Sequence, residues 1–130
     1  DWEPHGVHRH YLGVVDDTER QASLREICGD RRFDDLRYAI TNFLAVSELA
    51  TQQSATVEVA ALNIAPLITN PRLVLAAVAL SPAHLAYLSA VKATGFITVP
   101  YEVFPSVALA REWIALRTGL RLPPPDTPRG

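Results

Sequence analysis

Residues 72–80, "RLVLAAVAL", form an unbroken apolar run after a single arginine, with no alternation of polar and apolar side chains. This pattern is typical of a strand in a parallel sheet that is covered on both faces. The run is far shorter than the roughly 20 residues that a helix needs to span a bilayer, and Ser81-Pro82 stops it. We therefore predict a central strand here and no membrane span.

A helix is predicted on the C-terminal side of this strand, over residues 81–95. Ser81 suits the N-cap, Pro82 suits the first helical position because its missing N–H is not needed there, and Gly95 suits the end. The apolar side chains that we expect to turn inward are Leu85, Leu88 and Val91.

The segment before the strand, residues 51–65, also has a helical period. Its apolar positions are Val57, Ala61, Ile64 and Ile68. Either Thr51 or Ser54 is expected to cap the helix. Pro66 cannot donate a hydrogen bond to the carbonyl of Leu62, which predicts a kink or a broken last turn.

Three further segments are predicted as strands. Residues 7–15 mix β-branched, aromatic and polar side chains, which indicates a strand with one wetter face. Residues 36–46 are predicted to be mostly buried. Residues 96–104 contain Pro100, which lacks a ladder donor and therefore favours an edge strand or a bulge.

Two more helices complete the alternation. The first is predicted over residues 17–28, with Asp16 as its N-cap and Gly29 in the left-handed conformation at its end. The last is predicted over residues 106–118 and ends at Gly119. Its inward side chains are expected to be Leu109, Trp113 and Leu116.

The alternation of strands and helices implies right-handed crossovers and a largely parallel sheet. We expect a single α/β domain over residues 1–119. It should have a four- to five-stranded, mostly parallel sheet, mixed at the edge, and about four helices. Residues 120–130 are too rich in proline to pack as a helix and are predicted to be an extended tail.

The composition is that of an ordinary globular protein. The chain is 48% hydrophobic and 20% charged, with a formal net charge of −2, which argues against a nucleic-acid binder. Cys28 is the single cysteine, so no intrachain disulfide can form. No basic-then-apolar leader is visible. A reducing, cytoplasmic location is the simplest expectation.

Three segments together resemble the SpoIIAA-like branch of the STAS-type domains. They are GVHRHYLGVVDDTERQASLREICGDRRFDDLRYAITNF, NPRLVLAAVAL and YEVFPSVALAREWI, within a resemblance that covers about residues 6–116. That superfamily includes bacterial anti-sigma-factor antagonists and the cytoplasmic part of sulfate transporters. The resemblance implies the same α/β fold and a regulatory or binding role.

The resemblance also identifies a departure at the start of the helix predicted over residues 51–65. Phospho-switched members carry an Asp-Ser-Ser-Gly-like motif there, whose serine a partner kinase modifies. This chain has Thr51-Gln52-Gln53-Ser54, without the acid or the glycine, and Gln53 stands where the acceptor serine would fall. Gln53 has no hydroxyl to modify. Modification of Ser54 or Thr51 is left open.

Four histidines and one cysteine are the other candidates for chemistry. His8 and His10 should share one side of a strand near His5, but no cysteine or spaced histidine pair completes a metal site, so we expect no metal and a wet strand face. His84 lies near a helix start, without a serine, cysteine or acid at a known catalytic spacing. For Cys28 we expect a buried, inert thiol.

Several polar residues are expected to meet at a rim above the strand ends, where helix N-termini favour a small anion. They are Asn42, Ser47, Thr51, Gln52, Gln53, Ser54, Ser81 and His84, with Ser106 as a further member. The walls of this crevice should be apolar, with Phe43, Leu49 and Tyr87 available for a partly hydrophobic ligand.

The sequence therefore favours a non-enzymatic STAS-like module without a cofactor. It would bind a protein partner or a small anionic or lipid-like ligand at the rim. Two alternatives stay open: a small hydrolase or transferase that uses His84, and a self-association module. The second would form a homodimer through the first strand or the edge strand near Pro100.

Overall fold

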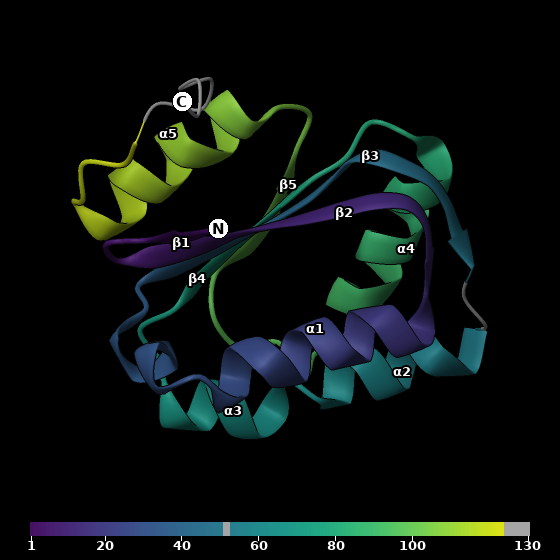
Figure 1. Cartoon of the computed structure of the whole chain (residues 1–130), viewed down its shortest axis with the longest axis horizontal. Coiled ribbons are helices and arrows are strands. Elements are labelled where there is room, and N and C mark those ends of the chain that lie inside the picture. Colours follow the sequence, from purple (N-terminus) through teal and green to yellow (C-terminus); the bar gives the residue numbers. More distant parts are fainter. Residues whose placement is uncertain (51–52, 124–130) are drawn as a thin grey trace.

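One five-stranded sheet forms the centre of the computed structural model, which describes residues 1–50 and 53–123 (Figure 1). The strands are β1 (Trp2–Glu3), β2 (Gly6–Asp16), β3 (Tyr38–Ala50), β4 (Val74–Val78) and β5 (Tyr101–Phe104). They lie side by side in chain order, with β1 antiparallel to β2 and the other pairs parallel. The prediction of a mostly parallel sheet, mixed at one edge, is confirmed.

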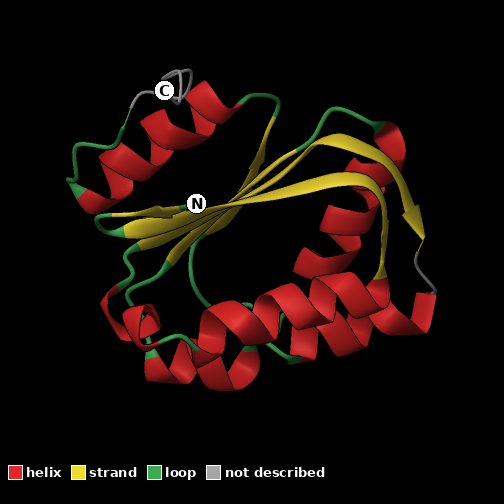
Figure 2. Cartoon of the chain, in the orientation of Figure 1, coloured by secondary structure: helices red, strands yellow, loops and turns green. Residues whose placement is uncertain are grey.

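Helices cover both faces of the sheet, as Figures 1 and 2 show. The helices are α1 (Asp17–Gly29), the 3-10 turn η1 (Arg31–Asp35), α2 (Gln53–Ala61), α3 (Ile64–Thr69), α4 (Pro82–Ala93) and α5 (Val107–Thr118). Each parallel crossover leads to the next strand in the same direction, so crossovers of one hand place α1 to α4 on one face. Helix α5 follows the last strand and covers the other face.

The predicted central strand is β4, which lies between β3 and β5. Its alternate side chains enter two separate cores. Val74, Ala76 and Val78 pack toward α5. Ala77 faces the opposite core, with Leu88 and Val91 of α4. This double coverage explains the unbroken apolar run in the sequence.

The segment predicted as one helix over residues 51–65 contains the break between α2 and α3. The break lies at Leu62-Asn63, before Pro66, and Pro66 falls in the first turn of α3, where its missing N–H costs nothing. Ser54 lies inside α2 and is therefore not its N-cap. Thr51, the other predicted cap, is outside the described residues.

Two boundaries differ from the predictions. Gly29 does not adopt the left-handed conformation, and α1 ends instead at an extended Asp30, whose N–H donates to the Ile27 carbonyl at 3.2 Å. Residues 96–99 are not part of the edge strand, which begins after Pro100. Gly119 does take φ of +73° and ends α5 as predicted.

The predicted inward faces of α4 and α5 are partly wrong. Leu109 is 45% exposed and Leu116 is 83% exposed, because α5 buries Ala110, Arg111 and Ile114 instead. Leu85 is 38% exposed, and α4 instead buries Tyr87 and His84 beside Leu88 and Val91. Polar residues occupy both inward faces, so hydrophobic periodicity alone placed those faces wrongly.

In Figure 1 the chain begins at the sheet, beside β1, and the described part ends beside α5. The short strand β1 pairs with the start of β2, which the sequence analysis did not anticipate. Leu120 and Leu122, within the predicted tail, pack on the core under α5. The remainder of that tail, residues 124–130, is outside the described residues.

Candidate functional site

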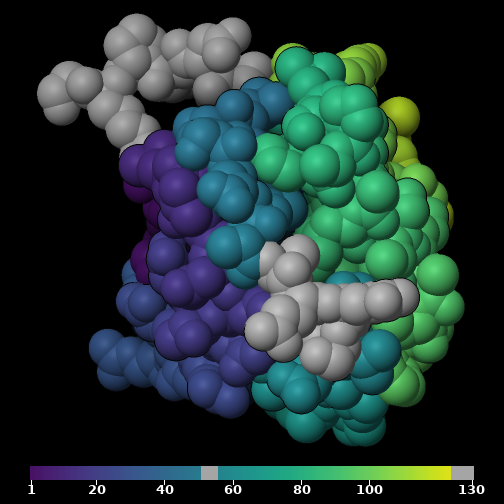
Figure 3. Space-filling model, turned by 90° about the vertical axis from the view of Figure 1, so that its right-hand side faces the viewer, coloured from purple at the N-terminus to yellow at the C-terminus, as the bar shows by residue number. Residues whose placement is uncertain are grey.

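A cavity of about 110 Å³ lies between the sheet and the helices α1 to α4. Its walls are mostly apolar and come from many elements. They include Leu24 of α1, Leu67 of α3, Leu75 of β4, Leu88 of α4 and Ile97 from the connection to β5. Figure 3 shows one side of the molecule, with the purple to blue segment that contains α1 on the left, α4 in green on the right, and α2 and α3 in teal at the bottom.

Small side chains on the sheet leave room for this cavity. Ala39 and Thr41 of β3 line it, and their register partners in β4 are Leu75 and Ala77. Alternation along β3 directs these two residues away from α5, toward α1 to α4. Both keep part of their surface exposed, although a strand flanks β3 on each side here.

Arg9 of β2 brings a positive charge to the wall of the cavity. Its guanidinium donates to Ser23 Oγ at 3.2 and 3.3 Å, to Thr41 Oγ1 at 3.5 Å and to the hydroxyl of Tyr11. It also lies 5.3 Å from the centre of the Tyr11 ring. These described hydrogen-bond partners are all uncharged.

Arg20 of α1 is the second arginine in the wall, and it is only 3% exposed. Its Nη2 donates to the carboxylate of Asp17, one helical turn earlier. The guanidinium lies over the ring of Tyr87, 4.7 Å from its centre. Its Nε and Nη1 atoms are buried without a hydrogen-bond partner. Such unsatisfied buried donors are rare in folded proteins and need an explanation.

The charges around the cavity do not balance. No aspartate or glutamate is among the described residues that line it, and the ion pair described for Asp17 is with Arg20. A charge held away from water without an ionic partner is costly. The lining therefore favours the entry of a negatively charged group.

Three other side chains of the wall, Cys28, Tyr87 and Tyr101, stay neutral near pH 7. Burial raises the pKa of the Cys28 thiol, and the nearby Arg9 charge only partly opposes this. Burial likewise raises the pKa of Tyr87, against the charge of Arg20, and the pKa of Tyr101. The two phenols therefore keep their protons, and Cys28 is a thiol that is half-buried, whereas the sequence predicted a buried one.

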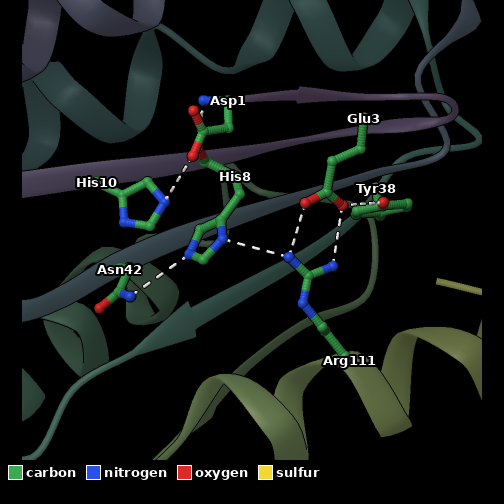
Figure 4. A network of polar contacts seen from close by, with 7 residues as sticks. All are labelled: Asp1, Glu3, His8, His10, Tyr38, Asn42 and Arg111. Carbon is green, nitrogen blue, oxygen red and sulfur yellow. Dashed lines mark hydrogen bonds and ion pairs between the residues drawn. The ribbon is translucent and has the colours of Figure 1, made fainter. Parts of the chain in front are cut away.

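A second polar cluster lies on the opposite face of the sheet, under α5 (Figure 4). Arg111 donates to both carboxylate oxygens of Glu3, at 2.9 and 2.7 Å, and Tyr38 donates to one of them. Burial raises the pKa of Glu3, but the hydrogen bonds from Arg111 and Tyr38 outweigh it and leave that pKa below its ordinary value. The cluster holds β1 against α5.

His8 belongs to this cluster and is buried, contrary to the expectation of a wet strand face. Its Nδ1 lies 3.3 Å from Nη2 of Arg111, and its ring centre is 3.8 Å from that of His10. Burial, followed by the charges of His10 and Arg111, lowers the pKa of His8 to about 4. Among the described residues, no group of three histidines, cysteines or acids is arranged to hold a metal ion.

The structure separates two of the predicted rim residues, Asn42 and His84. Asn42 faces the α5 side of the sheet, where its Nδ2 lies 3.4 Å from Nε2 of His8. His84 is buried on the other side, with its ring centre 6.3 Å from that of Phe43. The sheet therefore separates these two side chains.

The other described rim residues come from different elements. Ser47 is exposed on β3, which runs on beyond Asn42 to Ala50 without pairing to β4. The start of α2, with Gln53 and Ser54, follows that overhang, whereas Ser81 precedes α4 at the end of β4. The Ser106 hydroxyl accepts from the N–H of Leu109 as a helix cap. Thr51 and Gln52 are outside the described residues.

Sequence reasoning missed both arginines of the cavity. Arg9 alternates with Val7 and Tyr11 on the buried side of β2, and Arg20 precedes Leu24 by one helical turn. An arginine at a core position of a strand, followed by another in the apolar stripe of the next helix, is a sequence signal that could have indicated a buried basic site. Long basic side chains at such positions must find partners or an anion inside the fold.

Comparisons with known proteins give no relative: no family model, curated protein or solved structure matches this chain. In the described part of the chain, none of the helices combines the length and the apolar character needed to cross a bilayer.

Proposed function

We propose that this protein is a non-enzymatic binding module that holds a small, mainly apolar molecule between its sheet and the helices α1 to α4. The observation that carries this proposal is the cavity of about 110 Å³ with its apolar wall. An apolar cavity of about 150 Å³ in another protein stays dry and binds benzene. A space of this order therefore suits a small aromatic group or a short hydrocarbon chain.

The resemblance to SpoIIAA-like domains supports a regulatory use of this binding. In that role, the bound molecule would change how a protein partner recognises the module. Helix α2 packs against both α1 and α4, and its Val59 lines the cavity, so ligand occupancy would act on the helix whose start corresponds to the modified motif of the phospho-switched STAS domains. A reducing compartment such as the cytoplasm suits the free thiol of Cys28.

Titration with octan-1-ol, a neutral apolar probe, tests the proposal by nuclear magnetic resonance of backbone amides. We expect saturable shifts at residues that line the cavity, such as Leu75 and Ile97. The variant Ala39→Leu should fill the space and abolish the shifts. The matched control Ala86→Leu adds the same side chain at an exposed position of α4 and should bind as the original chain does.

Two outcomes contradict this proposal. One is the absence of saturable shifts with octan-1-ol in the folded protein. The other is equal binding to the Ala39→Leu and Ala86→Leu variants, which would place the probe outside the cavity.

A further inference from the structure

We infer that the natural occupant of the cavity is an apolar monocarboxylate, with its carboxylate against Arg20 and its hydrocarbon or aryl body among the aliphatic side chains. This inference rests on the proposed function and specifies the chemical class of ligand. It is carried by the unpartnered atoms of Arg20 together with the uncompensated charge of Arg9.

The free donors of Arg20 define where the head group binds. Nε and Nη1 are buried and lack acceptors, while Nη2 is already held by Asp17. The side chain is fixed on two sides, by that ion pair and by the ring of Tyr87, so it cannot turn outward without losing both contacts. An oxygen acceptor that enters the cavity would satisfy the donors where they stand.

The charge balance selects a monoanion. With Asp17 paired to Arg20, the charge of Arg9 remains, and its described hydrogen bonds go only to hydroxyl groups. One negative charge on the ligand would neutralise the site. A dianion would leave an excess negative charge within an apolar wall, and an ammonium group would be repelled by both arginines.

The rest of the wall suits an apolar body. Leu67, Leu73 and Ile97 line the cavity and belong to a hydrophobic cluster near α3 and the connection to β5. A polar tail would lose its hydration there without gaining partners. The ligand is therefore amphipathic, with one charged end and one apolar end.

Isothermal titration calorimetry with three probes of equal chain length tests this inference: octanoate, octan-1-ol and octylamine, all at pH 7.5. We expect octanoate to bind at least ten times more tightly than octan-1-ol, because only the acid carries the compensating charge, and octylamine to bind most weakly. In Arg20→Met, the affinity for octanoate should fall at least tenfold, and the affinity for octan-1-ol should stay within about twofold.

Two further variants secure the interpretation. Arg117→Met removes an exposed arginine that also lies over an aromatic ring, Trp113, but lies outside the cavity, and it should leave all three affinities unchanged. Arg9→Met replaces a half-buried arginine and should weaken octanoate selectively even where Arg20→Met does not fold. Thermal unfolding of each variant establishes that it is folded before titration.

The outcomes separate the two proposals. Equal affinities for octanoate and octan-1-ol, or octanoate binding that neither cavity-arginine variant weakens, would overturn the monocarboxylate inference while the binding function stands. Failure of all three probes to bind the original chain would instead contradict the binding function itself.

Discussion

Arg111 of the last helix, α5, and Glu3 of the first strand, β1, are joined by two hydrogen bonds, at 2.9 and 2.7 Å, between side chains that are both more than nine-tenths buried. The pair closes the α5 side of the sheet, and His8 and Tyr38 complete its surroundings. Removing one member would leave the other charged and withdrawn from water.

The variant Arg111→Met should therefore destabilise the protein by about 3–5 kcal/mol, the usual cost of leaving one partner of a buried ion pair alone. Urea denaturation measures this loss. The control Glu102→Gln breaks the exposed pair between Lys92 and Glu102 and should cost less than about 1 kcal/mol. Similar losses in the two variants would contradict the structural role assigned to the buried pair.

Stability should fall as the solution is acidified, because His8 is buried in its neutral form. Its pKa is lowered from 6.5 in the unfolded chain to about 4 in the folded protein. Between these pH values the unfolded state binds a proton that the folded state does not. The stability present above pH 6.5 is thus lost as pH decreases, at up to about 1.4 kcal/mol per pH unit from this group.

Urea midpoints between pH 7.5 and 4.5 check this prediction. His8→Gln should flatten the pH dependence, since it removes the titrating group. His5→Gln removes an exposed histidine as a control and should leave the dependence unchanged. If His8→Gln kept the pH dependence of the original chain, another group would be responsible for the loss of stability in acid.

Gly6 packs directly on the ring of Tyr38, its register partner in β3, and a Cβ atom at this position would overlap that ring. Gly6→Ala should therefore cost about 1–3 kcal/mol, the range for overpacking a core. Gly29→Ala, at the end of α1, meets open space and ordinary backbone angles, so it should be neutral or stabilise by up to about 0.5 kcal/mol. Thermal unfolding of both variants measures these changes in stability. Equal changes in the two variants would contradict the close packing of Gly6 on Tyr38.

The orientation of α5 can be tested by truncating two of its apolar side chains. Ile114 is fully buried, so Ile114→Ala should cost about 2–5 kcal/mol. Leu116 is largely exposed, so Leu116→Ala should change stability by less than about 0.5 kcal/mol. A larger loss of stability in Leu116→Ala than in Ile114→Ala would contradict this orientation of α5 and would favour the inward face predicted from the sequence.

Strands and helices could be located from local patterns with good accuracy. The unbroken apolar run that contains β4, the N-cap at Asp16 and the stop at Gly119 all depend on side chains within a few residues of each other, and each lies as predicted. The largely parallel sheet followed from the alternation of strands and helices, since right-handed crossovers favour it. The family resemblance remains a prediction.

The candidate site could not be found in the same way. Periodicity assigned Leu109 and Leu116 to the core, but the structure leaves them exposed and buries Arg111 on the same helix. The rim was predicted from residues at the expected strand ends. The sequence pattern does not indicate that β3 extends past its pairing with β4, or that Asn42 and His84 lie on opposite faces of the sheet.

The sequence by itself determined the α/β class, the single folded unit and the interior strand within residues 72–80, because these follow from local propensity and from the burial of apolar runs. Only the tertiary structure decided that Arg9 and Arg20 share the wall of one cavity and that Glu3 meets Arg111 under α5. The reason is physical: whether a buried charge is compensated depends on groups that the fold brings together from distant positions, and no local pattern records them.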